Sequence, residues 1–237
     1  TSAYSGKIAL RRNGSCAIKN DGAVWCWGGG ANGELGNGTT TATQVTPVRV
    51  RDSSAYTQIT SGELFTCGLR TDGSAWCWGL DMFQQLGNGG STTSQNVPSA
   101  VSGGRRWTKL AAGWRHACGI EATGNMYCWG YNLDGQLGNG NTTQQSTPVL
   151  VNGGIKWVEL AAGAYMTCGI DVKGQMWCWG RNQNGMLGGG EYNTTNPERE
   201  PILVRDPGPW TRVAAGDKQI CGIKNDGSLW CWGDTQA

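Results

Sequence analysis

Ten cysteines are the residues of this chain whose type and spacing could do chemistry. They form five pairs with nine residues between partners, and Trp or Tyr directly precedes each second cysteine. The pairs are Cys16/Cys26, Cys67/Cys77, Cys118/Cys128, Cys168/Cys178 and Cys221/Cys231. Nine intervening residues do not match the spacing of zinc ligands, and His116 is the only histidine that could complete a site. We therefore expect five disulfides, no metal site and no cofactor.

The residues inside each pair predict a hairpin. The segment from Cys16 to Cys26 is symmetric about Asp21, so a three-residue loop Asn20–Gly22 places the two cysteines opposite each other. Such a loop needs positive φ at its third residue, which glycine supplies. The other copies carry glycine at the same offset, at Gly73, Gly124, Gly174 and Gly227. In a non-hydrogen-bonded antiparallel pair the Cα atoms lie about 4.5 Å apart, within reach of a disulfide.

Complete pairing of the cysteines indicates an oxidising compartment, so we expect an extracellular protein, secreted or on the cell surface. Each bridge closes a loop that chain-entropy arithmetic values at roughly 3 kcal/mol. Four Asn-x-Ser/Thr sequences are candidate glycosylation sites, and three of them fall in long loops that we expect to be exposed. They are Asn13, Asn37, Asn141 and Asn193.

The cysteine pairs recur with a nearly constant period. Their first members are 51, 51, 50 and 53 residues apart, which is typical of an array of one supersecondary unit. The third copy shows four strand candidates and no sustained helical periodicity. These are 107–113, 117–120, 125–130 and 147–151. Four short strands per period, repeated radially, predict the blades of an all-β propeller.

The repeated motif Ala-Ala-Gly-x4-Cys-Gly-Ile, Trp-Cys-Trp-Gly-x-Asn-x2-Gly-x-Leu-Gly-x-Gly and Thr-Pro-Val-x-Val resembles the regulator-of-chromosome-condensation repeat, in its cysteine-bearing secreted form. The resemblance covers nearly the whole chain and implies one β-propeller domain over residues 1–237. The five repeats span approximately 1–51, 52–102, 103–152, 153–205 and 206–237, and the last lacks its fourth strand. The family usually has seven blades, so two interpretations follow. We favour a closed five-bladed ring, with residues 1–6 supplying the missing strand, over an excerpt of a longer propeller.

Composition argues against several functions. Charged residues make up 15 % of the chain and the net charge is +2, which gives no electrostatic reason to expect nucleic acid or a membrane surface. No apolar run approaches the roughly 18 residues of a spanning helix, so membrane insertion is not expected. No nucleophile, base or clustered carboxylates share a catalytic spacing, and we expect a protein that is not an enzyme.

Tryptophans that recur in register predict packing between blades, so functional residues should lie where the copies differ. The turns between first and second strands differ most and should gather at one end of the propeller axis, where loops on a rigid scaffold bind partners. The turns are 63–65, 114–116, 164–166 and 217–219. From them we predict a protein-binding set of Leu64, Trp114, Arg115, Tyr165 and Lys218. His116 is expected to hydrogen-bond a neighbouring turn.

The favoured function is therefore a non-enzymatic interaction or structural module that binds a protein partner, or another copy of itself, through its axial loops. The alternative is a lectin with a Trp-lined carbohydrate pocket in every blade. A lectin would repeat equivalent pockets around the ring, whereas the axial turns differ from copy to copy. This difference favours a protein partner.

Overall fold

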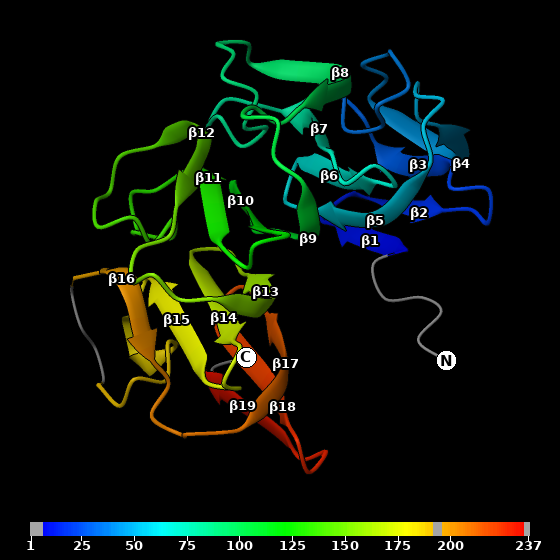
Figure 1. Cartoon of the computed structure of the whole chain (residues 1–237). Helices are drawn as coiled ribbons and strands as arrows, with labels where there is room; N and C mark the ends of the chain where they lie inside the picture. The colour runs from blue at the N-terminus through cyan, green and yellow to red at the C-terminus, as the bar shows by residue number, and fades with distance from the viewer. Residues whose placement is uncertain (1–6, 192–195, 235–237) are drawn as a thin grey trace.

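The computed structural model describes residues 7–191 and 196–234. In these ranges it contains nineteen strands in five antiparallel sheets and one short 3-10 turn, η1 (Gln183–Gly185). Each sheet is a blade built from consecutive strands in the order of the chain. No helix among the described residues is long and apolar enough to cross a membrane. The prediction of an all-β chain of propeller blades is confirmed (Figure 1).

Among the described residues, four blades have four strands and the last has three. Blade 1 contains β1 (Ile8–Arg11), β2 (Gly14–Ile18), β3 (Val24–Gly29) and β4 (Thr43–Arg49). Blade 2 contains β5 (Tyr56–Ser61), β6 (Phe65–Arg70), β7 (Ala75–Leu80) and β8 (Ser94–Ala100). Blade 3 contains β9 (Trp107–Ala112), β10 (His116–Glu121), β11 (Met126–Gly130) and β12 (Gln145–Leu150). Blade 4 contains β13 (Trp157–Ala162), β14 (Met166–Asp171), β15 (Met176–Gly180) and β16 (Glu198–Leu203). Blade 5 contains β17 (Trp210–Ala215), β18 (Gln219–Lys224) and β19 (Leu229–Gly233).

The predicted hairpin register is confirmed in every blade. The two cysteines of each hairpin lie directly opposite each other on the second and third strands, with Cα atoms 4.0 to 4.1 Å apart. All ten cysteines form the expected disulfides, which are Cys16–Cys26, Cys67–Cys77, Cys118–Cys128, Cys168–Cys178 and Cys221–Cys231. The loop glycines adopt the required positive φ, for example +82° at Gly22 and +81° at Gly124. A symmetric sequence around a glycine-bearing turn thus determined the pairing.

The surroundings of the blade 2 bridge differ from the repeated motif. Cys77 is fully buried and bridged to Cys67, but its partner on the fourth strand β8 is Ser99. The Ser99 hydroxyl accepts from the side-chain amide of Asn88 at 3.1 Å. In blades 1, 3 and 4 the residue opposite the second cysteine is apolar: Val48, Val149 and Ile202. The Pro-Val pattern of the fourth strand is therefore not kept next to Cys77, although the disulfide itself is.

The five blades form an open arc, so our preference for a closed five-bladed ring is wrong. Extensive contacts join the innermost strands of consecutive blades, β1 to β5, β5 to β9, β9 to β13 and β13 to β17. Within the described ranges no comparable contact joins β17 to β1, and Figure 1 shows blades 1 and 5 at the two ends of the arc. Each blade packs on the next in the same way, and among the described strands the rotation from blade 1 to blade 5 is too small to bring β17 back against β1. Residues 1–6, expected to supply the missing strand, lie outside the described residues.

A tryptophan on the third strand links each blade to the one before it. Trp78, Trp129 and Trp179 are fully buried, and each donates its indole N–H to a loop carbonyl of the preceding blade. The indoles lie flat against loop glycines such as Gly36 and Gly87, where a Cβ would collide with the ring. The predicted role of these tryptophans in packing between blades is therefore confirmed. Tyr56, Trp107, Trp157 and Trp210, at the start of the first strands, are also buried.

Glycines bring the blades together at the axis. A Cβ added to Gly62 would overlap the carbonyl oxygen of Gly113, and Gly113 has the same relationship to Gly163 in the next blade. Next to them, the Glu63 amide donates to the carbonyl oxygen of Trp114 at 3.2 Å. Arg11 replaces this glycine in blade 1, and its guanidinium turns back to donate to the carbonyl oxygen of Gly29 at 2.9 Å. These close approaches bring the turns between first and second strands to one end of the axis.

Candidate functional site

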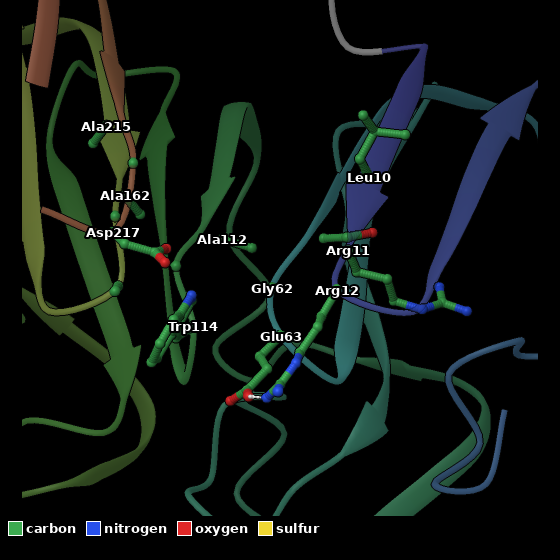
Figure 2. Close-up of a pocket in the computed structure, with 15 residues that line it drawn as sticks. Leu10, Arg11, Arg12, Gly62, Glu63, Ala112, Trp114, Ala162, Ala215 and Asp217 are labelled. Carbon is green, nitrogen blue, oxygen red and sulfur yellow. Dashed lines mark hydrogen bonds and ion pairs between the residues drawn. The ribbon is translucent and has the colours of Figure 1, made fainter. Parts of the chain in front are cut away.

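A cavity of about 640 Å³ runs along the axis between the innermost strands of all five blades. Its wall is mostly the backbone of Ala-Gly segments, and Arg12, Glu63, Trp114 and Asp217 lie at one end (Figure 2). These four residues belong to the turns between first and second strands of blades 1, 2, 3 and 5. The turns thus converge on the axis as the sequence predicted.

An ion-pair cluster connects the first three of these turns. The carboxylate of Glu63 lies 3.3 Å from the guanidinium of Arg12 and 3.6 Å from that of Arg115. The side chain of Glu63 is mostly buried, whereas Arg12 is largely exposed and Arg115 partly so. Glu63 therefore orients two arginines from different blades, and both keep donors facing solvent.

Aromatic and cationic side chains alternate in the neighbouring turns. The rings of Trp114 and Tyr165 meet edge to face with centroids 5.2 Å apart. The guanidinium of Arg181 lies 3.8 Å from the centre of the Tyr165 ring and donates to Asp134 at 2.8 Å. Cation–π contact and the ion pair restrict the rotamers of these large side chains before any partner binds.

A second aromatic pair extends this surface. Phe83 and Tyr131 meet edge to face with ring centroids 5.4 Å apart, and the Arg115 guanidinium lies 4.5 Å from the centre of the Phe83 ring. Burial and then the Asp134 carboxylate raise the pKa of Tyr131, against the lowering effect of Arg115 and Arg181, so its hydroxyl stays protonated at neutral pH. We call this set the axial face: Arg12, Glu63, Phe83, Trp114, Arg115, Tyr131, Asp134, Tyr165 and Arg181.

The structure brings together three of the five predicted binding residues. Trp114, Arg115 and Tyr165 contact one another or shared neighbours within the axial face. Leu64 follows Glu63 in the blade 2 turn and is half-buried, and within the described ranges it takes no part in the ion pairs and ring contacts of that cluster. Lys218 lies on the exposed blade 5 turn and pairs with Asp234 at 3.5 Å. These two residues border the axial face rather than belong to it.

His116 has a structural role, as expected. It is fully buried, and its Nε2 lies 2.8 Å from the Thr167 hydroxyl in blade 4. Because that hydroxyl donates to the carbonyl oxygen of Gln136 at 2.8 Å, it accepts from His116, which fixes the proton on Nε2. The Nδ1 atom is buried and has no hydrogen-bond partner among the described residues, and burial lowers the pKa of His116 to about 3. The ring is therefore neutral and holds blades 3 and 4 together.

Sequence reasoning missed Phe83, Tyr131, Asp134 and Arg181, which lie in the loops between third and fourth strands. Successive turns of an antiparallel sheet alternate between its two ends, so these loops lie at the same end as the turns between first and second strands. The residue after the recurrent Trp-Gly varies between Leu80, Tyr131 and Arg181. Comparing the copies at this position, as at the turns, would have found two of the four.

The candidate glycosylation sites lie at different places. Asn13 is exposed in the turn between β1 and β2, and Asn141 is exposed in the loop before β12. Asn37 is half-buried in the loop before β4, where its side-chain oxygen accepts from the Thr39 amide and hydroxyl. Asn193 lies outside the described residues.

Comparison with known proteins supports the repeat assignment. The model of the "Regulator of chromosome condensation (RCC1) repeat" matches four segments that cover most of the chain, 21–69, 72–120, 123–170 and 173–223. Human E3 ubiquitin-protein ligase HERC2 is 32 % identical over 127 residues, which are 52 % of this chain and 3 % of HERC2. Human Protein RCC2 is 32 % identical over 136 residues, 54 % of this chain and 26 % of RCC2. The chain thus corresponds to a small part of these relatives' length.

Solved propellers share the fold. Prp20p from Saccharomyces cerevisiae superposes with a TM-score of 0.83 at 20 % identity, covering 97 % of this chain and 57 % of Prp20p. The ectodomain of the Physcomitrella patens receptor kinase CR4 gives a TM-score of 0.60 at 24 % identity, covering 96 % of this chain and half of that one. Both identities are low, so these likenesses concern the fold alone. With four matched repeats on five disulfide-bridged blades, the chain belongs to the regulator of chromosome condensation (RCC1) repeat family.

Proposed function

We propose that this chain is a non-enzymatic, extracellular interaction module that binds a protein partner through its axial face. The observation that carries the proposal is the contact series from Trp114 through Tyr165 to Arg181, in which large, half-buried side chains hold one another at one end of the axis. Tryptophan, tyrosine and arginine dominate the binding energy of protein interfaces, and restricted rotamers reduce the entropy lost on binding.

Protein partners are also known in the family. Prp20p has described binding properties to Gsp1p and histones, and yeast RCC1 has been solved bound to Kap60. For the present chain the axial face carries arginines and carboxylates in nearly equal number, which favours a partner surface of mixed charge over a polyanion. The low net charge agrees with this preference.

An extracellular location is proposed on two grounds. All ten cysteines are joined in disulfides, which persist in oxidising compartments. The related folds include ectodomains of plant receptor kinases. Glycans at Asn13, Asn37, Asn141 or Asn193 belong to the same proposal.

The test compares the wild-type chain with Trp114→Ala/Tyr165→Ala as immobilised baits for surface proteins of the source organism. Val172→Ala is the matched control, because Val172 is exposed in the loop between β14 and β15, at the opposite end of the blade. A genuine partner should bind wild type and control alike and should lose at least about 2 kcal/mol, roughly 30-fold in affinity, with the double variant. Equal binding to all three baits would exclude the axial face, and release by millimolar monosaccharide would favour a lectin instead.

A further inference from the structure

Two variable positions are brought together in every blade. One is the residue directly before the second strand, and the other directly follows the Trp-Gly of the third strand. The backbone amide of the latter donates to the carbonyl oxygen of the former at 2.6 to 3.1 Å. The donors and acceptors are Gly29 with Asn13, Leu80 with Leu64, Tyr131 with Arg115, Arg181 with Tyr165 and Asp234 with Lys218. A constant backbone bond thus sets two changing side chains side by side.

A loop of the preceding blade adds a third side chain to these pairs. The Phe83 ring contacts the Tyr131 ring, with centroids 5.4 Å apart, and lies 4.5 Å from the Arg115 guanidinium. One blade later Asp134 holds the position of Phe83 and accepts from Arg181 at 2.8 Å. Between blades 4 and 5 the third residue is Asn184, which donates to Asp234 at 3.1 Å.

We call each such group a junction triplet. Blades 2 and 3 form the triplet Phe83, Arg115 and Tyr131, and blades 3 and 4 form Asp134, Tyr165 and Arg181. In the same register of the repeat, blades 1 and 2 contribute Asn32, Leu64 and Leu80. All nine residues are half-buried, so each is supported by the propeller and open to a partner on one side. The axial face therefore contains two triplets and borders an apolar third.

In the two triplets of the axial face the cation points outward and the carboxylate beside it points inward. The Arg181 side chain is 36 % exposed and that of Asp134 15 %, while Arg115 is 39 % exposed and Glu63 14 %. The second oxygen of Asp134, Oδ2, is buried. The Nη groups of both arginines make no hydrogen bond to any residue in 7–191 or 196–234. A partner therefore meets two guanidinium groups with free donors and not the carboxylates that orient them.

The anion that fits these arginines is a carboxylate on a protein surface. Glu63 and Asp134 already face the two guanidinium groups, so they would repel a doubly charged phosphate more strongly than a singly charged carboxylate. Two exposed apolar side chains, Met82 and Leu133, occupy equivalent positions in the same loops. A nucleic acid backbone or a small anion would leave them in water, whereas a protein surface can cover them.

We propose that the junction triplets are the contact units of the axial face, and that its protein partner presents, in order around the axis, an apolar side chain to Leu64 and Leu80 and one carboxylate each to Arg115 and Arg181. This inference rests on the proposed function of the axial face and deepens it. Counting charges alone favours a partner of mixed charge, and the exposure of the arginines narrows its contacting charges at these two triplets to carboxylates.

A displayed random-peptide library is the probe, because the enriched peptides report which side chains the triplets accept. The wild-type chain should enrich peptides that carry an apolar residue and two carboxylates. On Arg115→Glu or Arg181→Glu the same library should yield lysine or arginine in place of one carboxylate. Lys173→Glu is the matched control, because Lys173 is exposed in the turn between β14 and β15, at the opposite end of the blade, and should return the wild-type peptides.

A synthetic peptide from the wild-type selection gives the size of the effect by fluorescence anisotropy. Arg115→Glu and Arg181→Glu should each weaken its binding roughly fivefold, and lysine in place of the matching acidic residue of the peptide should restore it. Arg115→Gln and Arg181→Gln remove the charge without adding repulsion against Glu63 or Asp134. They should weaken binding about twofold, and they decide the question if a glutamate variant loses its native circular dichroism spectrum.

A transplanted triplet tests whether the three positions act as a unit. Asp134→Asn/Tyr165→Leu/Arg181→Leu copies the triplet of blades 1 and 2 onto blades 3 and 4, above the same backbone bond. Peptides selected on this variant should carry an apolar residue in place of the second carboxylate.

The outcomes separate this inference from the proposed function. Selected peptides that still bind Trp114→Ala/Tyr165→Ala would contradict both. Peptides that lose binding to that variant but respond neither to the arginine variants nor to the transplant would overturn the junction triplets alone. The same holds for a wild-type selection that enriches no peptide or enriches peptides without carboxylates.

Discussion

The indole N–H of Trp129 donates to the backbone carbonyl of Gln85 at 3.0 Å, and this single bond joins the third strand of blade 3 to the loop of blade 2. Trp129 is fully buried, and its ring lies against Gly87, also in that loop. Trp78 and Trp179 repeat the relationship with Glu34 and Gln136. The packing between blades therefore includes a hydrogen bond that the indole N–H donates and that a phenylalanine could not make.

Replacing Trp129 by Phe should lower the free energy of unfolding by about 2–3 kcal/mol. The change leaves the buried carbonyl of Gln85 without its donor and opens a cavity where the larger ring was. Denaturant unfolding followed by circular dichroism measures the loss. Trp27→Phe is the control, because Trp27 holds the same position in blade 1, where no described blade precedes it, and is only half-buried. A similar loss in both variants would contradict the interlocking role.

His116 should make the fold sensitive to acid. Its pKa is lowered by burial to about 3 in the folded state, from an ordinary value of 6.5. Above pH 6.5 both states are neutral and the residue has no pH effect. Below pH 6.5 the imidazole is protonated in the unfolded chain but stays neutral in the folded chain. The free energy of unfolding therefore falls, with a limiting slope of about 1.4 kcal/mol per pH unit, down to about pH 3.

His116→Met isolates this contribution, because Met166 fills the same position in blade 4. Urea unfolding of both proteins from pH 7.5 to pH 4 should show their stability difference shifting in favour of the variant as the pH falls. Parallel curves would mean that His116 is charged or solvated in the folded protein.

Asp81 should destabilise the fold at neutral pH. It is 3 % exposed, its Oδ1 accepts from the Leu86 amide at 3.0 Å, and its Oδ2 is buried with no partner in the part of the chain that the structure describes. In blade 3 the amide of Asn132 fills this position and donates to the carbonyl oxygens of Asn141 and Thr143. Burial raises the pKa of Asp81 to about 6 in the folded state, from an ordinary value of 3.8. Protonation of Asp81 therefore stabilises the folded state fully below pH 3.8, and this contribution is lost as the pH rises through 6.

Asp81→Asn should therefore raise the free energy of unfolding at pH 7 by about 1–3 kcal/mol. The reciprocal change Asn132→Asp in blade 3 should lower it by a similar amount. Thermal unfolding at pH 7 and pH 4 measures both, and the gain from Asp81→Asn should shrink at the lower pH. A gain that is equal at both values would show that ionisation of Asp81 is not the cause.

The five disulfides should differ in resistance to reduction. Cys231 is exposed and Cys221 half-buried, whereas the eight cysteines of blades 1 to 4 are fully buried. A thiolate must reach the sulfur to reduce it, so mild dithiothreitol should open the Cys221–Cys231 bridge first and leave a buried bridge such as Cys67–Cys77 intact. Alkylation and peptide mapping over time give the order. Simultaneous reduction of all five would mean that global unfolding controls access.

Removing a buried bridge should weaken the fold without abolishing it. Cys118→Ala/Cys128→Ala should cost roughly 2–4 kcal/mol, because the unfolded chain regains the freedom of the hairpin while blades 2 and 4 still pack on either side. The measurement is chemical unfolding with the native spectrum as the control for fold. An unfolded double variant at room temperature would show that the bridges, and not the contacts between blades, hold the arc together.

The strands and their register could be predicted because they depend on local sequence. The symmetric segment around Gly22 determines which residues face each other, and Cys16 and Cys26 pair accordingly. Closure of the ring could not be predicted in this way. It depends on the angle between adjacent blades, which is set by contacts such as that of Gly62 with Gly113, 51 residues apart in the chain.

The axial face was predicted in part for a similar reason. Trp114 and Tyr165 stand out because the copies differ in one turn. Arg181 reaches the Tyr165 ring from another loop, and the importance of that loop follows only from the alternation of turns along each sheet. Asp81 was also missed, because what distinguishes it is one buried carboxylate oxygen, Oδ2, that accepts no hydrogen bond from any described residue.

The contacts between blades have a direction. Trp129 donates a hydrogen bond to a loop of the preceding blade, whereas Gly113 packs against the backbone of the following blade. The family repeat runs from one hairpin loop to the next, for example over residues 72–120, so it contains the last two strands of one blade and the first two of its neighbour. A gene duplication with these endpoints would carry both halves of an interface as one piece, and the arc could gain or lose a blade without creating a mismatched junction.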